Sequence, residues 1–218
     1  MSKQAKSLQS LSVQAIHRLP YYLRRLKDLE RQGVETISSP AMAGFLGLHE
    51  IQVRKDLAAI SSTSGKPRAG FPVKELIHDM EQFLGYHNVN EAVLVGVGHL
   101  GRALLSYDGF KAYGLNIVTA FDKNSSLIGS TINEKKILST DTMSDLCRRM
   151  NIHIGIITVP ADCAQEVCNQ LVDGGVCGIW NFAPTHLSVP KHVLVQNENM
   201  AASLALLSKH LGQLIETE

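Results

Sequence analysis

EAVLVGVGHLGRALLSYDGFKAYGLNIVTAFD, residues 91–122, is the stretch that decides the fold of the C-terminal part of this chain. An apolar run, 92–95, leads into the pattern Gly96-x-Gly98-x-x-Gly101, and a helical stretch and a second apolar run, ending in Asp122, follow. A strand, a glycine turn, a helix and a strand closed by an acid form the order of a βαβ dinucleotide-binding unit. We therefore expect a parallel sheet with a nucleotide site at its edge.

The residue types in the turn suit a pyrophosphate. Gly96 permits the tight turn, Gly98 has no Cβ to block the approach of a phosphate, and Gly101 lets the helix pack close to the strand. A helix that starts near Leu100 offers free N–H groups to the phosphates. The predicted cofactor contacts in this segment are Gly96, Val97, Gly98, His99, Leu100 and Gly101.

Asp122 lies 21 residues after the third glycine, where such a unit presents an acid to the adenosine ribose. Its carboxylate can accept bonds from both ribose hydroxyls, and its charge would repel a 2′-phosphate. NADH/NAD is therefore the predicted cofactor, in preference to NADP. The alternative is a glycine turn kept only for packing, with Asp122 as an ordinary strand-end residue.

Composition sets the broad class. The chain has 218 residues, of which 44% are hydrophobic, and no apolar run long enough to span a bilayer. The first ten residues, MSKQAKSLQS, lack the apolar stretch of a signal peptide. We expect a cytoplasmic protein with no membrane partner. The four cysteines form no CxxC pair and no His/Cys cluster with zinc spacing, so no metal site is predicted; Cys177 is expected as a small buried residue in a strand.

The formal charge of +1 conceals an asymmetry. Residues 1–74 carry twelve Lys/Arg and five Asp/Glu, whereas the remainder carries nine and fifteen. A basic first third on a nearly neutral chain indicates a polyanionic partner for that part alone.

The basic part reads as a winged helix-turn-helix. Leucines at helical spacing predict a first helix that starts at Pro20, with a helical piece at 13–18 before it and a kink at the proline. Two short helices follow, one started by Ser39 and Pro40 and ended by Gly47, the other over 50–60. The Ser-, Gly- and Pro-rich segment 61–72 suits a β-hairpin wing, and a further helix covers 73–84.

The remainder alternates strands and helices, which indicates a parallel sheet with right-handed crossovers. A last helix over 200–211 carries apolar residues on more than one face and is expected to pack against several neighbours, a second subunit among them. The predicted fold is α/β, with a winged helix-turn-helix domain at 1–85, a Rossmann-like domain at 86–198 and a C-terminal helix at 199–218.

This arrangement resembles the bacterial Rex redox-sensing repressors. The resemblance rests on RLPYYLRRLKDLERQGVETISS (18–39), IQVRKDL (51–57), VLVGVGHLGRALLSYDGF (93–110), FD (121–122), ITVPADCAQEVCNQLVDGGVCGIWNFAP (157–184) and VPKHVLVQNENM (189–200). It implies a homodimer in which each terminal helix inserts between the domains of its partner. It also implies a repressor of palindromic operator DNA that senses the NADH/NAD ratio and is released by NADH.

The resemblance places Arg54 and Lys55 in the recognition helix, where they would meet base edges or phosphates, with Gln52 as a weaker candidate. Lys66 and Arg68 in the wing would meet the backbone or the minor groove. The alternative for these side chains is ordinary solvated surface.

Two further segments are predicted walls of the nicotinamide pocket, because each follows a core strand at its carboxyl edge. They are Thr158, Val159 and Pro160, and Asn181 and Phe182; simple loop packing is the alternative.

The resemblance also suggests switch residues. Tyr107 matches a tyrosine tied to interdomain movement, and Arg24 matches an arginine that pairs with an aspartate at the start of the partner's terminal helix. Many members have Asp-Phe there, whereas this chain has Asn199-Met200, so Met200 would cover the cofactor in place of a ring.

No catalytic residue is predicted. His99 lies in the glycine turn and His186 in a loop, and neither belongs to a recognisable His-plus-acid arrangement. The alternatives to a repressor are a small NAD-dependent oxidoreductase and a CoA- or nucleotide-binding module. The first needs a substrate pocket and a positioned acid or base, which the sequence does not show, and the second would not explain the basic helix-turn-helix.

Overall fold

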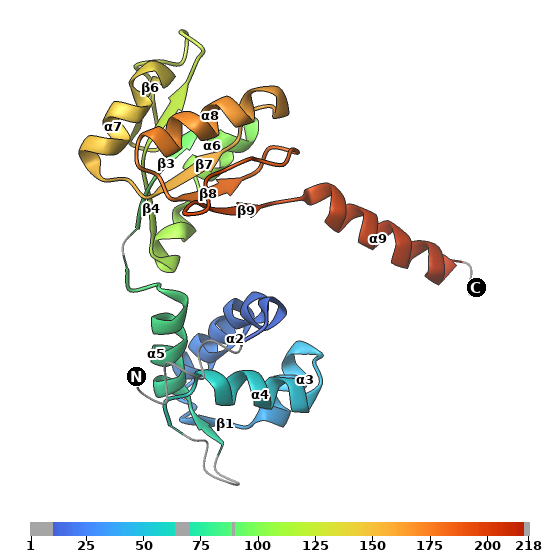
Figure 1. Ribbon diagram of the computed structural model, residues 1–218. Helices are drawn as coiled ribbons and strands as arrows, with labels where there is room; N and C mark the ends of the chain where they lie inside the picture. Colours follow the sequence, from blue (N-terminus) through green and yellow to red (C-terminus); the bar gives the residue numbers. More distant parts are fainter. Residues whose placement is uncertain (1–10, 64–69, 89, 216–218) are drawn as a thin grey trace. The chain divides into compact units, whose positions relative to one another are not determined.

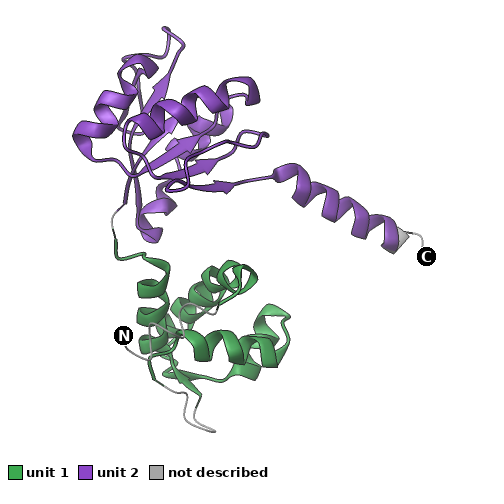
Figure 2. Ribbon diagram, in the orientation of Figure 1, with its two compact units in different colours: residues 1–88 green, residues 89–218 purple. Residues whose placement is uncertain are grey.

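The computed structural model describes residues 11–63, 70–88 and 90–215. The chain divides into two compact units, unit 1 with residues 1–88 and unit 2 with residues 89–218 (Figure 2). Each unit has a buried apolar core of its own, so each is described by itself.

Unit 1 contains the predicted helix-turn-helix. Its elements (Figure 1) are α2 Val13–Arg31, β1 Thr36–Ile37, α3 Ser39–Leu46, α4 Glu50–Ile60, β2 Phe71–Pro72 and α5 Val73–Leu84. The side chain of Ser38 caps α3 by accepting the Ala41 N–H at 3.3 Å. Gly47 ends α3 with a φ of 63°, a left-handed conformation that favours glycine.

The base of the wing is a short antiparallel pair in which Ile37 of β1 lies opposite Phe71 of β2. The predicted wing residues Lys66 and Arg68 lie outside the described residues. Just after the end of α4, the Ser62 N–H donates to Asp79 Oδ2 at 2.6 Å, and the Thr63 hydroxyl donates to Glu75 Oε2 at 3.0 Å. These bonds fasten the end of α4 to α5.

Helix α2 runs through Pro20. The predicted helical piece at 13–18 is confirmed, but it is continuous with the rest of the helix, so the predicted start at Pro20 was wrong. The helix begins at Val13, where Ser12 Oγ accepts the Ala15 N–H at 3.2 Å. A proline inside a helix removes one backbone hydrogen bond. Ala15 and Leu19 are buried, so packing of the upstream turns against the core offsets that loss. At the other end, Gly33 follows the cap residue Gln32 with a φ of 75°, a left-handed conformation that favours glycine.

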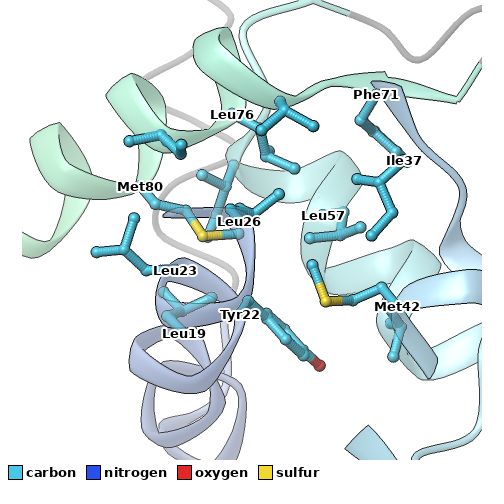
Figure 3. Close-up of a cluster of buried hydrophobic side chains, with 14 of the residues drawn as sticks. Leu19, Tyr22, Leu23, Leu26, Ile37, Met42, Leu57, Phe71, Leu76 and Met80 are labelled. Atoms are coloured by element: carbon cyan, nitrogen blue, oxygen red, sulfur yellow. The ribbon is translucent and has the colours of Figure 1, made fainter. Parts of the chain in front are cut away.

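The core of unit 1 joins α2, α3, α4 and α5 (Figure 3). Its labelled members are Leu19, Tyr22, Leu23, Leu26, Ile37, Met42, Leu57, Phe71, Leu76 and Met80. Full burial of one such side chain stabilises the fold by roughly 1.5–3 kcal/mol. Apolar packing therefore fixes the placement of α4 against the rest of the unit.

Unit 2 is a Rossmann-like sheet with the strand order β5-β6-β4-β3-β7-β8-β9. The pairs are parallel except β5 with β6. The strands are β3 Asn90–Val95, β4 Leu115–Asp122, β5 Thr131–Ile132, β6 Lys135–Ser139, β7 Ile154–Ile157, β8 Gly178–Asn181 and β9 Leu194–Asn197. The chain leaves β3 toward β4 and β6 on one side and returns to β7, β8 and β9 on the other. In such sheets ligands bind at the carboxyl edge where the order reverses, beside β3.

Helices connect the strands of unit 2. They are α6 His99–Leu105, α7 Met143–Met150, α8 Ala161–Asp173 and the 3-10 turns η1 Asp108–Tyr113 and η2 Thr140–Thr142. One apolar cluster unites Phe121, Cys147 and Leu171, and a second contains Leu94 and Ile156. The predicted α/β alternation is confirmed.

The prediction for Cys177 was wrong, because this residue is exposed and lies just before β8 begins at Gly178. Cys147 and Cys168 are buried, and burial raises the pKa of both thiols, that of Cys147 to about 11.

The terminal helix α9 covers Met200–Ile215 and extends beyond the predicted end at 211. Five large apolar side chains of this helix are exposed: Met200, Leu204, Leu206, Leu207 and Leu211. Within the described ranges, no helix has the length and apolarity needed to cross a membrane.

Candidate functional site

Close packing shapes the glycine turn after β3. Gly96 has a φ of 98°, and a Cβ there would lie 2.8 Å from Val159 Cγ1. A Cβ on Gly101 would lie 2.0 Å from the Gly96 carbonyl oxygen. A Cβ on Gly98, in contrast, would meet nothing within 4 Å. Two glycines are therefore required by packing, whereas the third leaves open space over the turn, where a phosphate can approach.

A cleft of about 640 Å³ opens beside this turn, at the reversal of the strand order. The glycine turn, the end of β4, η2, the loop after β7 and the first turns of α8 line it. This volume lies within the usual range of small-molecule and cofactor sites. Thr158, Val159 and Pro160 line the cleft, at the carboxyl edge of β7.

Asp122 ties the end of β4 to the glycine turn. Its Oδ2 accepts the Val97 N–H at 2.6 Å, and its Oδ1 accepts the Asn124 N–H at 2.8 Å. Each carboxylate oxygen has a second lone pair, so both can accept one more hydrogen bond. Asp122 lines the cleft and can therefore receive two neighbouring hydroxyl groups.

Thr158 connects β7 to the same turn. Its hydroxyl lies 2.7 Å from the Gly96 carbonyl oxygen, to which it donates, and its N–H donates to Val95 O at 2.9 Å. The floor of the cleft is thus one bonded unit made of the ends of β3 and β7. Among the other predicted turn residues, Val97 is buried, and His99 and Leu100 form the first turn of α6.

Asn181 and Phe182 are not among the residues that line the cleft. Asn181 is fully buried, and its amide donates to the Asn197 side chain at 2.8 Å and to Thr185 O at 3.0 Å. Phe182 packs against Trp180, with ring centroids 4.9 Å apart. In this structure both residues organise the loop after β8.

Helix α4 presents Arg54 and Lys55 to solvent, and the described residues give neither an ion-pair partner. Gln52 differs, because its side-chain amide lies against the Arg18 guanidinium; with the amide oriented to satisfy hydrogen bonding, its oxygen accepts from Arg18 at 2.8 and 3.1 Å. A side chain held in this way is less free to contact a base than the side chains of Arg54 and Lys55 are.

A buried charge cluster beneath α4 was missed by the sequence analysis. Asp56 is 5% exposed and accepts Arg18 Nη2 at 2.7 Å, Arg18 Nε at 2.9 Å and the Tyr22 hydroxyl at 2.9 Å. Burial and the bond to Asp56 raise the pKa of Tyr22 to about 12. The cluster joins α2 to α4 and so helps to hold the helix that carries Arg54.

One signal in the sequence pointed to this cluster. Val53, Asp56, Leu57 and Ile60 have the i, i+3, i+4, i+7 spacing of a buried helix face. An aspartate at an apolar position needs a buried partner, although the spacing does not say which residue supplies it.

The predicted switch residues lie in both units. Arg24 is exposed on α2. Tyr107 is 53% exposed and meets Phe110 edge-on, with centroids 4.9 Å apart. Asn199 caps α9, its Oδ1 accepting the Ala202 N–H at 3.0 Å, and Met200 begins the helix with an exposed side chain. A contact between Arg24 and Asn199 of a second copy stays a prediction.

No group of three or more His, Cys, Asp or Glu side chains within the described ranges could hold a metal ion. What the fold and these sites define is a regulator class: a basic helix-turn-helix unit joined to a sensor unit with a nucleotide-type cleft.

Comparisons with known proteins narrow this class. Residues 10–58 match the family described as putative DNA-binding protein N-terminus, and residues 87–185 match the CoA binding domain. The redox-sensing transcriptional repressor Rex of Bacteroides fragilis is 39% identical over 197 residues, which are 90% of this chain and 89% of the relative.

Two solved structures of a Rex-family repressor, RSP, are also similar. RSP in complex with NAD+ and operator DNA has a TM-score of 0.87 and 33% identity, covering 95% of this chain and 96% of that one. RSP in complex with NADH has a TM-score of 0.83 and 32% identity, covering 95% and 98%. This chain belongs to the Rex family of redox-sensing transcriptional repressors. The relatives are named as repressors, which agrees with the prediction of a regulator and not an enzyme.

Proposed function

We propose that this protein is a homodimeric repressor that binds palindromic operator DNA through α4 and the wing, and that NADH in the cleft of unit 2 releases it. The observation that carries the proposal is the presence in one chain of an open nucleotide-type cleft and a helix-turn-helix with exposed Arg54 and Lys55. The related RSP structures, with NAD+ and operator DNA and with NADH, support the same pair of ligands.

The cofactor half of the proposal depends on the glycine turn and Asp122. Gly98 leaves room for a pyrophosphate, and both oxygens of Asp122 can accept ribose hydroxyls. A 2′-phosphate would meet the charge of this carboxylate. The site therefore takes NADH or NAD in preference to the phosphorylated forms.

The dimer half depends on α9. A helix with five large exposed apolar side chains suits burial against a second copy, which would place Asn199 near the partner's Arg24. The expected exchange of terminal helices between copies is part of this proposal.

The main test is a DNA-binding titration. The intact protein first selects its site from random-sequence duplexes, and binding to that duplex is then measured with NADH, NAD and CoA in parallel. We expect release by NADH at concentrations where CoA has no effect. Binding that ignores all three ligands would refute a sensor, and release by CoA alone would favour the CoA-binding alternative.

Single substitutions test DNA binding and cofactor binding separately. Arg54→Ala and Lys55→Ala should each weaken DNA binding by about 1–3 kcal/mol, roughly 5- to 150-fold, and leave NADH binding unchanged. Asp122→Ala removes a charged acceptor and should weaken NADH binding by about 1.5–3 kcal/mol while relaxing discrimination against NADPH. DNA affinity at the wild-type level in both α4 variants would contradict the assignment of this helix.

The dimer contact has its own test. Asn199→Asp restores a charge opposite the proposed partner residue Arg24 and should strengthen the NADH response. The double variant that adds Arg24→Ala should lose this gain. If Asn199→Asp has no effect, the two residues do not meet.

A further inference from the structure

The connection between the sheet and the terminal helix is very short. Strand β9 ends at Asn197 and α9 begins at Met200, so Glu198 and Asn199 alone join them. Because Asn199 is already the cap of α9, the direction in which the helix leaves the sheet depends on how Glu198 is held.

Three hydrogen bonds hold this connection against the end of β8. The indole Nε1–H of Trp180 donates to Glu198 Oε1 at 2.9 Å, and the Glu198 N–H donates to the Asn181 carbonyl at 2.8 Å. The Asn181 amide donates to Asn197 Oδ1 at 2.8 Å. The bond from Trp180 is the one among them that reaches the carboxylate of Glu198.

Trp180 is itself held in a row of aromatic rings. Its centroid lies 5.6 Å from that of Phe110 and 4.9 Å from that of Phe182, and Phe110 meets Tyr107 at 4.9 Å. Tilted and edge-on contacts of this kind favour one ring orientation. A change in the loop after β8 or at η1 therefore reaches the Trp180 ring.

The same loop is bonded to the strand that ends at the cleft. The Phe182 N–H donates to Ile157 O at 2.9 Å, and Ile157 directly precedes Thr158 in the cleft floor. A continuous path of bonds and ring contacts thus runs from the cleft floor through Phe182 and Trp180 to Glu198.

We propose that Trp180 and Glu198 are a positioning pair that couples occupation of the cleft to the direction of α9, and so makes DNA release depend on NADH. The inference rests on the proposed function. Neither residue of the pair lines the cleft, and both belong to unit 2, so its loss removes the coupling between the two ligands while each ligand still binds.

The test uses the intact protein and measures a coupling factor, the ratio of DNA affinities without and with saturating NADH. Trp180→Phe keeps a ring in the row but removes the donor, and Glu198→Ala removes the acceptor. Each should reduce the coupling factor at least fivefold, while NADH affinity without DNA and DNA affinity without NADH stay within about twofold of wild type. Glu198→Gln keeps the acceptor oxygen and should retain most of the coupling.

Two controls make the result specific. The double variant Trp180→Phe/Glu198→Ala should lose no more coupling than either single variant, because both remove the same bond. Gln165→Ala removes side-chain bonds to Ser188 in the same unit, away from the row, and should keep the wild-type factor.

If NADH releases the wild type from DNA and both Trp180→Phe and Glu198→Ala keep the full coupling factor, the role of the pair is refuted. The proposed function would still stand in that case. A wild-type protein whose DNA binding ignores NADH would overturn the proposed function and this inference with it.

Discussion

In unit 1 the helix that carries Arg54 and Lys55 is held to α2 through its own buried carboxylate, Asp56, whereas in unit 2 the glycine turn packs closely against uncharged atoms. Asp56 needs the charge of Arg18, which is 38 residues away in the chain. Gly101 needs only the absence of a Cβ, because the Gly96 carbonyl fills that space. The first arrangement depends on a distant partner, and the second on one residue type.

The largest expected effect comes from breaking the charge contact in unit 1. Arg18→Met leaves Asp56 buried without its cation and should lower the free energy of unfolding by about 3–5 kcal/mol. Urea unfolding followed by far-UV circular dichroism measures the loss. Trp180, the one tryptophan of the sequence, reports on unit 2 through its fluorescence and should show an unchanged transition.

Arg31→Met is the matched control, because Arg31 pairs with Asp28 on the exposed surface of the same helix. Its cost should be at most about 1 kcal/mol. If Arg18→Met and Arg31→Met lower the free energy of unfolding equally, the burial of Asp56 does not strengthen its contact with Arg18.

The steric contact in unit 2 should have the next largest effect. Gly101→Ala places a methyl group against the Gly96 carbonyl and should destabilise unit 2 by about 1–3 kcal/mol, although alanine itself favours a helix. Dinucleotide binding should be lost with it. The Trp180 fluorescence transition in urea measures the stability change.

Gly98→Ala tests the same comparison from the other direction. Its Cβ meets no protein atom within 4 Å, so stability should stay at the wild-type level while dinucleotide affinity falls. A loss of stability in Gly98→Ala would contradict the role assigned to Gly98, and an unchanged stability in Gly101→Ala would contradict the role assigned to Gly101.

A smaller effect concerns the pH dependence of unit 1. The pKa of Tyr22 is raised from 10 to about 12, so the folded state holds this proton more tightly than the unfolded state. The resulting stabilisation is complete below pH 10 and is lost as the pH rises from 10 to 12. Tyr22→Phe should cost about 1 kcal/mol at neutral pH and flatten this alkaline loss.

Tyr21→Phe is the control, because Tyr21 is the exposed neighbour. Its unfolding free energy should follow the wild-type curve from pH 8 to 12. An alkaline loss that persists in Tyr22→Phe would place the responsible group elsewhere.

The smallest effect concerns the thiols of unit 2 and leaves stability unchanged. Exposed Cys177 and half-buried Cys163 should react with a maleimide at neutral pH, whereas buried Cys147 and Cys168, with raised pKa values, should not. Cys163 lines the cleft, so NADH should slow its labelling and leave that of Cys177 unchanged. Mass spectrometry of labelled peptides measures both rates, and equal protection of the two would remove Cys163 from the cofactor region.

Features of the two units that depend on local sequence patterns could be predicted. Glycine spacing, a strand-end acid and apolar residues at helical spacing are local patterns, so the βαβ unit, the limits of α4 and α5, and the position of Asp122 were predictable. The geometry of the turn requires glycine at fixed positions, so the pattern can be recognised in the sequence.

Contacts between distant residues leave no such pattern. The partner of Asp56, the bond between Trp180 and Glu198, and the internal bonding of Asn181 depend on which surfaces the fold brings together. The continuation of α2 through Pro20 was missed for the same reason, since burial of the upstream turns outweighs the local preference of proline.

Leu204, Leu206, Leu207 and Leu211 of α9 are exposed in a single copy, and this makes assembly a matter of mass action. If a second copy covers them, dilution of the protein uncovers apolar surface and lowers the fraction able to span two half-sites. The amount of repressor in the cell would then help to set the redox threshold, and a change in its expression would shift that threshold without any change in NADH affinity.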